Sequence, residues 1–246
     1  MDSLKNKVIL ITGGAQGIGG ATAQLCAERG ADVIIADLRE DLGEPLAATI
    51  REGGGKAAFY PLDVRDAEAV EGTFDQVRTR YGRLDVLICA AGVLQGALLQ
   101  PEEFPIETFD FVMDVNVKGS FLCTKYATPL LVDAQGSIIL IASGAGVTGG
   151  SSSIAYGTSK GAVNGMGMVL EGHLSSRGVR VNVVCPGSIV SELKLEQMRS
   201  AAEYQGKGFD REEAIQKLGD PGGVANVLAF LASDDAKYVK RNLFTR

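Results

Sequence analysis

Histidine is nearly absent from this sequence, with His173 as the single example among 246 residues. Neither a multi-histidine metal site nor a Ser/His/Asp triad is therefore favoured. Cysteine is also scarce, and its four positions lie far apart in apolar stretches without a CxxC motif or a Cys/His cluster. We expect small core residues in a reducing compartment, with no bound metal and no disulfide. The four residues are Cys26, Cys89, Cys123 and Cys185.

Long hydrophobic runs, low-complexity tracts and blocks of like charge are missing as well. The apolar run before the first glycines is too short for a signal-peptide core or a membrane span, so we expect a cytoplasmic protein. A net charge of −6 disfavours general affinity for nucleic acid or anionic membranes. The expected ligands are small molecules.

Short apolar runs alternate with longer segments of helical period, which is typical of strands joined by crossover helices. Continuous Val/Ile/Leu runs indicate strands that are covered on both faces. The sequence therefore predicts a single α/β domain, with a Rossmann-like, doubly wound parallel sheet flanked by helices on both faces. The expected strands are 8–12, 32–37, 57–63, 84–90, 137–143 and 179–186. The expected helices are 17–29, 40–53, 66–81, 106–132 and 154–177.

The pattern loosens at about 188–220, after the sixth expected strand. Mixed helical and glycine-bearing sequence at this place predicts a substrate lid, with a plain surface excursion as the alternative. In a doubly wound sheet the ligand crevice opens at the carboxyl ends of the strands. Residues that follow the strands are thus the candidates for chemistry.

The first candidate is "TGGAQGIGG", residues 12–20, between the first strand and the first helix. Glycines let the backbone turn tightly and approach a diphosphate, and the helix N-terminus offers free amides to it. The key positions are Gly13, Gly17 and Gly19, with Gln16 and Ile18 between them. A purely structural turn is the alternative.

Asp37 ends the second strand and is followed by Leu38 and Arg39. A carboxylate at this position can accept hydrogen bonds from both ribose hydroxyls of an adenosine and repels a 2′-phosphate, which favours NAD. Arg39 keeps NADP open, because a guanidinium could receive the extra phosphate. Asp37 could also be only a turn residue or a helix cap.

Two further segments follow strands. Asp63 is placed to hydrogen bond an adenine amino group with Val64 against the ring, although a helix N-cap is nearly as plausible for an aspartate there. In "CAAGV", residues 89–93, small residues would let a cofactor lie against the backbone. Those residues are Ala90, Ala91 and Gly92.

The strongest candidate is a set of four polar residues. Ser143 ends the fifth strand, Tyr156 and Lys160 share one helix face four residues apart, and Asn116 lies in an earlier helix. Free tyrosine has a pKa near 10, and a nearby ammonium favours the phenolate. Tyr156 is therefore a candidate general acid or base. Taken alone, Asn116 could equally be a helix-bending or core polar residue.

In the order and spacing of these motifs, the sequence resembles the short-chain dehydrogenase/reductase family, in its branch of about 250 residues. The resemblance runs from "TGGAQGIG" through Asp37, "AAG", Ser143 and "YGTSK" to "NVVCPGSIVS" and "DPGGVANVLAFLASDDAKY". It implies hydride transfer at a nicotinamide, with Tyr156 exchanging the proton and Ser143 hydrogen bonding the same substrate oxygen. Lys160 would hold the nicotinamide ribose and lower the tyrosine pKa, and Asn116 would anchor a water in the relay to Lys160.

The same resemblance assigns the nicotinamide carboxamide to a segment after the sixth strand, and it implies a homotetramer or homodimer. That segment contributes Pro186, Gly187, Ile189 and Ser191. Two features depart from the family. Cys89 and Ala90 replace two asparagines, and residues 237–246 form an atypical tail that leaves a seventh strand open.

The main hypothesis is an NAD(H)-dependent oxidoreductase that interconverts a secondary alcohol and a ketone. The alternatives are an NADP-dependent carbonyl reductase and a non-catalytic dinucleotide-binding protein. The expected pocket walls, residues 93–98 and 144–149 and the lid after Ser188, are mostly small and apolar. Strongly anionic substrates are therefore mildly disfavoured, and the substrate itself is not specified.

Overall fold

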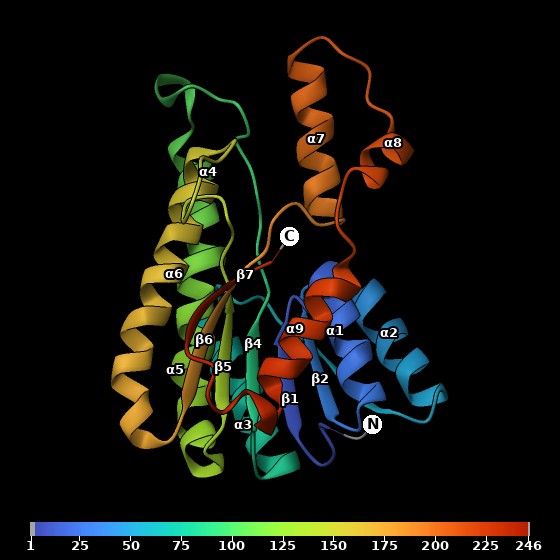
Figure 1. The fold of residues 1–246 in the computed structure, drawn as a ribbon, viewed down its shortest axis with the longest axis vertical. Coiled ribbons are helices and arrows are strands. Elements are labelled where there is room, and N and C mark those ends of the chain that lie inside the picture. The colour runs from blue at the N-terminus through green and yellow to red at the C-terminus, as the bar shows by residue number, and fades with distance from the viewer. Residues whose placement is uncertain (1–2, 246) are drawn as a thin grey trace.

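A computed structural model describes residues 3–245, which form one doubly wound domain around a seven-stranded parallel sheet (Figure 1). The strand order is β3-β2-β1-β4-β5-β6-β7. The strands β1 to β3 are added toward one edge of the sheet and β4 to β7 toward the other, so the strand order reverses between β1 and β4. The strands are β1 (Val8–Thr12), β2 (Asp32–Asp37), β3 (Lys56–Pro61), β4 (Val86–Cys89), β5 (Ser137–Ile141), β6 (Arg180–Cys185) and β7 (Arg241–Phe244).

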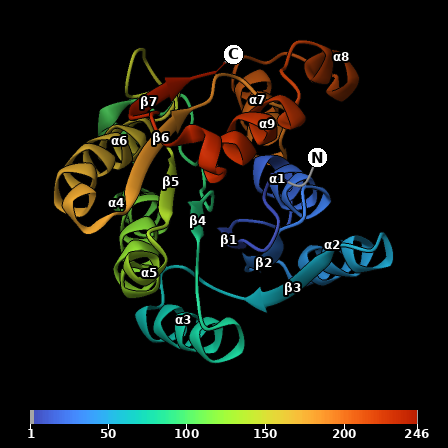
Figure 2. The ribbon, with the colours of Figure 1, turned by 60° about the horizontal axis from the view of Figure 1, so that its bottom comes forward.

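Helices cover both faces of the sheet. Figure 2 shows α1, α2 and α9 on one face and α3 to α6 on the other. The helices are α1 (Gly17–Glu28), α2 (Glu40–Glu52), α3 (Ala67–Tyr81), α4 (Ile106–Met113), α5 (Ser120–Ala134), α6 (Ile154–Leu174), α7 (Glu192–Tyr204), α8 (Arg211–Gln216) and α9 (Pro221–Ala232). A π-helical segment, Asp114–Gly119, joins α4 to α5, and short 3₁₀ turns occupy Pro101–Glu103, Ser175–Arg177 and Asp234–Ala236. None of these helices is long and apolar enough to cross a membrane.

The core consists of two apolar layers that the strands supply in alternation. In β1, Val8 and Leu10 pack toward α3 and α5, while Ile9 and Ile11 pack toward α1 and α9. Side chains of a strand point alternately to opposite faces, so a strand covered on both sides must be apolar throughout. This explains the continuous Val/Ile/Leu runs, and it confirms the predicted sheet.

The predicted helix at 106–132 is not one regular helix. It is interrupted by the π-helical segment, whose wider turn carries Asn116. Insertions of this kind are frequent at functional sites. The four cysteines are all buried and free.

Within the tail at 237–246, residues Arg241–Phe244 form the strand β7. β7 pairs in parallel with β6, and the Asn182 side chain donates to the carbonyl oxygens of Val239 (3.2 Å) and Arg241 (3.3 Å). A seventh strand therefore forms without the sequence that the family uses there.

Residues 188–220 rise above the carboxyl edge of the sheet as α7 and α8 (Figure 1). Both ends of this segment meet at one place. The Gly219 amide donates to the Ser188 carbonyl and the Val190 amide donates to the Gly219 carbonyl, each at 2.9 Å. We call this pair of hydrogen bonds the neck of the α7–α8 segment.

Candidate functional site

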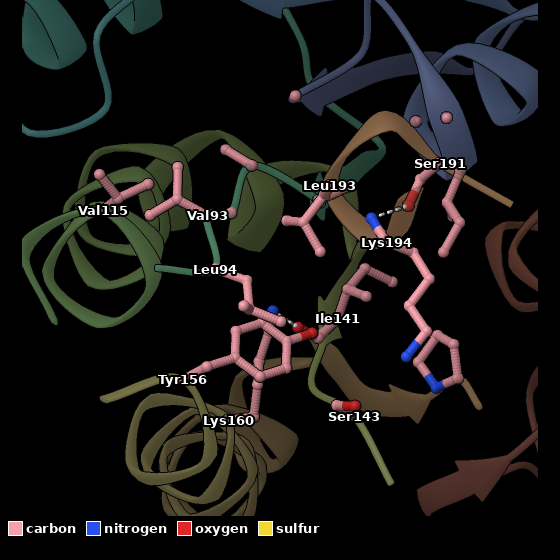
Figure 3. A pocket seen from close by; sticks show the side chains of 18 of the residues that line it. Val93, Leu94, Val115, Ile141, Ser143, Tyr156, Lys160, Ser191, Leu193 and Lys194 are labelled. Carbon is pink, nitrogen blue, oxygen red and sulfur yellow. Dashed lines mark hydrogen bonds between the residues drawn. The ribbon is translucent and has the colours of Figure 1, made fainter. Parts of the chain in front are cut away.

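A cavity of about 590 Å³ opens at the carboxyl ends of the strands, beneath α7 (Figure 3). Apart from Asn116, every residue that the sequence predicts for catalysis or cofactor binding lines this cavity. These residues are Gly13, Gln16, Gly17, Ile18, Gly19, Asp37, Leu38, Asp63, Val64, Ala90, Ala91, Gly92, Ser143, Tyr156, Lys160, Pro186, Gly187, Ile189 and Ser191. The sheet topology brings them together, because their segments follow six different parallel strands.

The glycine turn after β1 fits a diphosphate. Gly13 has a positive φ of 65°, and a Cβ on it would lie 2.6 Å from the Ala91 backbone. A Cβ on Gly19 would lie 2.0 Å from the Gly13 carbonyl oxygen. The N-cap residue of α1, Gln16, makes no side-chain cap hydrogen bond, so first-turn amides remain available to an anion.

Asp37 is held by two backbone amides. Its carboxylate accepts from the amides of Ala15 and Arg39, each at 3.0 Å. The Arg39 guanidinium turns instead to Asp41, with two hydrogen bonds of 2.8 and 2.7 Å. Asp37 is not the N-cap of α2, because that position belongs to Arg39. Within residues 3–245, the carboxylate therefore faces the cavity without a paired cation.

Asp63 is paired more strongly than the sequence suggests. Arg65 donates to both of its carboxylate oxygens at 2.6 to 3.1 Å and lowers the Asp63 pKa. The N-cap of α3 is Asp66, so the capping alternative for Asp63 is wrong. Arg65 also lies 5.1 Å above the Phe111 ring, and both residues line the cavity. Sequence reasoning missed them, although an arginine two residues after an aspartate was a usable signal.

Ser143 and Tyr156 meet at the other end of the cavity. Ser143 lies two residues beyond β5, and Tyr156 is in the first turn of α6, where its amide donates to the N-cap hydroxyl of Ser153 (3.2 Å). Burial raises the Tyr156 pKa, and a hydrogen bond with the Ser143 side chain opposes that rise. The pair is thus a neutral phenol beside a hydroxyl.

Lys160 is buried beneath Tyr156 (Figure 3). Its Nζ donates to the Ile141 carbonyl oxygen at 2.7 Å and lies 5.6 Å from the centroid of the Tyr156 ring. The residue is 6% exposed, and burial lowers the pKa of its ammonium to about 8. In this arrangement burial governs the Tyr156 pKa, and the ammonium is held by the strand end instead of by the phenol.

Asn116 lies behind the cavity wall. Its Oδ1 accepts from the Val93 amide (2.8 Å), and its Nδ2 donates to the Val93 carbonyl (3.0 Å) and to Ser159 Oγ (2.9 Å). The side chain therefore ties the segment after β4 to α6. A Cβ on Gly92 would lie 3.3 Å from Asn116 Oδ1 and 3.5 Å from Lys160 Nζ, so only a glycine leaves the space between them open.

Comparison with known proteins gives concordant matches over nearly the whole chain. A family model described as enoyl-(acyl carrier protein) reductase matches residues 13–243. An uncharacterized oxidoreductase, YxbG, of Bacillus subtilis is 36% identical and covers 97% of this chain and 89% of its own. Secoisolariciresinol dehydrogenase of Forsythia intermedia is 37% identical and covers 98% and 88%. The solved structure of an NAD⁺-bound xylitol dehydrogenase is 32% identical, covers 98% of both chains and has a TM-score of 0.89.

The chain belongs to the short-chain dehydrogenase/reductase family. It is accordingly an oxidoreductase that acts on CH–OH or carbonyl groups with a nicotinamide dinucleotide. This membership disfavours the alternative of a non-catalytic dinucleotide-binding protein.

The segment after β4 departs from the short-chain dehydrogenase/reductase pattern but keeps its position. Cys89 is buried in the core, where burial raises its pKa to about 12. The Ala90 amide donates to the Thr12 carbonyl (3.0 Å), and the Ala91 amide donates to the Thr12 hydroxyl (3.4 Å). Backbone hydrogen bonds thus hold this wall where two asparagine side chains are missing.

The walls at the substrate end are only partly those that the sequence predicts. Of the expected walls, Val93, Leu94, Gly144 and Ala145 line the cavity, whereas 95–98 and 146–149 do not. The second loop is pressed against α6 instead. A Cβ on Gly146 would lie 2.0 Å from the Gly157 carbonyl oxygen.

The first turns of α7 close the remaining side of the cavity. Ser191 caps the helix by accepting from the Lys194 amide (3.2 Å), and Leu193, Lys194 and Gln197 line the cavity. Sequence reasoning did not name these three residues. Their spacing after a serine N-cap, which places them on neighbouring positions of one helix face, was the available signal.

Proposed function

We propose that the protein is an NAD(H)-dependent oxidoreductase that interconverts a secondary alcohol and a ketone, with Tyr156 as the general acid and base. The observation that carries this proposal is the meeting of Ser143, Tyr156 and Lys160 in one cavity with the glycine turn. The cofactor supplies the hydride chemistry at its nicotinamide ring.

The residues of the chain would then supply binding and proton transfer. In alcohol oxidation, the Tyr156 oxygen takes the proton of the substrate hydroxyl, and in ketone reduction it returns that proton. The Ser143 hydroxyl donates a hydrogen bond to the same substrate oxygen. Lys160 holds the ribose, and its positive charge favours the phenolate when alcohol is the substrate.

Asp37 supports NAD over NADP. Its carboxylate lines the cavity with no cation paired to it, so a 2′-phosphate would meet a negative charge. The one cation that follows closely, Arg39, already holds Asp41. Asn116 would position the wall and α6 through its hydrogen bonds, with the proposed water relay as its further role.

The α7–α8 segment is proposed as the substrate lid, and a homotetramer or homodimer is proposed from the family resemblance. The protein is proposed to be cytoplasmic.

The substrate of this chain is a small molecule that fits beneath the lid, and the alcohols and ketones named for the relatives define a first panel for screening.

The test is the change Tyr156→Phe, assayed with oxidised NAD and a panel of secondary alcohols through nicotinamide absorbance. Losing a positioned acid/base group lowers turnover by roughly 10² to 10⁴. NAD binding, measured by titration, should stay within about twofold because the phenol hydroxyl is what the change removes. The matched control is Tyr126→Phe, since Tyr126 also has a lysine ammonium, that of Lys125, 4.8 Å from its ring centroid but lies outside the cavity. Retained turnover in Tyr156→Phe would reject the assignment.

A further inference from the structure

Lys194 brings an unpaired positive charge into the wall of the cavity. Its Nζ donates to Gln197 Oε1 at 2.8 Å, and within residues 3–245 no carboxylate lies at ion-pair distance from it. The side chain is partly buried, and this burial alone lowers its pKa. Three other cations of the α7–α8 segment have an acidic partner, whereas Lys207, which is exposed, donates to Gln205. These pairs are Arg199 with Glu196, Arg211 with Glu192, and Lys217 with Glu213.

The helix itself adds to this positive potential. Lys194 lies in the first turn of α7, a helix of 13 residues, where the macrodipole favours negative charge. The acidic residue of that turn, Glu192, is exposed and bonded to Arg211 of α8. A partly buried ammonium whose one acceptor is an amide oxygen is costly to keep, and a bound anion would relieve that cost. Two further ammonium protons are free to bind it.

The direction of the side chain separates two possible sources of the anion. Figure 3 shows Lys194 extending from α7 toward the end of the cavity where Ser143 lies, and away from the blue ribbon of the glycine turn. A cofactor diphosphate already has the amides of α1 and the glycine turn. The anion that remains for Lys194 is therefore carried by the substrate.

We propose that Lys194, held by Gln197, binds a carboxylate of the substrate, so that the substrate class is hydroxy acids and their oxo acids. The rest of the cavity wall determines which chain can connect the substrate carboxylate to the hydroxyl or oxo group that reacts. Leu94 and Leu193 line the same part of the cavity, which suits a short aliphatic chain (Figure 3). This inference rests on the proposed function, and it reverses the expectation from sequence that anionic substrates are disfavoured.

The test compares 4-hydroxypentanoate with 2-pentanol, its neutral counterpart, in the wild type and in Lys194→Met. The wild type should prefer the hydroxy acid, mainly through KM. Loss of a charged hydrogen bond should lower the selectivity ratio, kcat/KM for the acid over kcat/KM for the alcohol, about 10- to 100-fold. Lys194→Arg should restore part of the ratio. Lys207→Met is the matched control, because Lys207 also donates to a glutamine oxygen, of Gln205, but is exposed and outside the cavity.

A second measurement needs no turnover. Pentanoate and pentanamide are titrated into the protein saturated with NADH, with nicotinamide fluorescence as the signal. Pentanoate should bind more tightly than pentanamide to the wild type, and Lys194→Met should abolish that difference. Equal pentanoate affinity in the two proteins overturns the inference, as does an equal loss of activity on acid and alcohol. Weaker NADH binding in Lys194→Met, with the selectivity ratio unchanged, would assign Lys194 to the cofactor and also overturn it. A wild type that binds pentanoate but oxidises neither alcohol rejects the proposed function alone.

Discussion

At the residue scale, Tyr156 and Lys160 show one physical cause acting on two opposite charges. Burial disfavours the charged form of each group, so it raises the pKa of the phenol and lowers that of the ammonium to about 8. The phenol is thereby kept as a proton donor, which suits ketone reduction. Alcohol oxidation needs the phenolate, which in the proposed mechanism is favoured by the Lys160 ammonium.

Cofactor choice is also decided by single residues. We predict that the wild type binds NADH more tightly than NADPH, and that Asp41→Ala narrows the difference because it releases Arg39 to meet a 2′-phosphate. Adding Asp37→Asn should narrow it further, since the repelling charge is gone, although the asparagine oxygen can accept from only one of the two backbone amides that the carboxylate holds. Each change should shift the ratio of dissociation constants by about 10-fold, the equivalent of 1.4 kcal/mol. Titration of the wild type and the two variants with both cofactors measures this. A wild type that prefers NADPH would contradict the role given to Asp37.

The residues that sequence predicted share a local signature. Ser143 lies just past the end of an apolar strand, and Tyr156 and Lys160 have helical spacing, so position in the chain was enough to place them. Lys194 has no such signature, because its burial depends on how α7 folds back over the sheet. The same holds for Arg39, whose guanidinium could not be assigned to Asp41 or to the cofactor without coordinates.

At the scale of elements, the glycine turn between β1 and α1 leaves no space for a side chain at Gly19. A Cβ on Gly19 would lie 2.0 Å from a backbone oxygen that cannot move away as a side chain could. We predict that Gly19→Ala lowers the unfolding temperature and raises the dissociation constant for NAD at least 10-fold. Gly72→Ala is the control, since nothing lies within 4 Å of its added Cβ, and in mid-helix it should stabilise the protein by about 0.5–1 kcal/mol. Thermal unfolding and NAD titration check both. Normal NAD affinity in Gly19→Ala would contradict this reading of the turn.

Elements were predictable to the extent that their apolar pattern is local. β1 and β2 agree with the predicted ranges, and the other predicted strands differ by at most two residues at either end. The π-helical turn around Asn116 was not predicted. The Asn116 side chain in it bonds Val93 and Ser159, whose proximity a local apolar pattern does not reveal. β7 is a similar case, since its register depends on Asn182 of the neighbouring strand.

For the whole molecule, Lys160 couples stability to pH. Lys160 binds its proton less tightly in the folded protein, where its pKa is about 8, than in the unfolded chain, where the ordinary value is 10.5. A pKa difference of one between the two states corresponds to about 1.36 kcal/mol. Below pH 8 the charged Lys160 therefore lowers the free energy of unfolding by about 3 kcal/mol, and this loss of stability disappears between pH 8 and 10.5. We predict that the unfolding free energy of the wild type rises relative to that of Lys160→Met over this range.

Urea unfolding of both proteins at pH 7, 8, 9 and 10 measures the difference. Burial raises the pKa of Tyr156 and of the buried cysteines, so in this range these groups ionise in the unfolded chain, which contributes equally to both proteins. A difference that stays flat from pH 7 to 10 would show that Lys160 does not titrate as its burial requires.

The neck between Ser188, Val190 and Gly219 has a consequence for how such an enzyme acquires new substrates. Because the segment leaves and re-enters the domain through adjacent hydrogen bonds, exchanging what lies between them adds little loop-closure entropy and leaves the sheet intact. The α7–α8 segment is in this sense an interchangeable cassette. Transplanting it between family members would carry the recognition of the substrate with it, while the proton-transfer residues stay in the recipient.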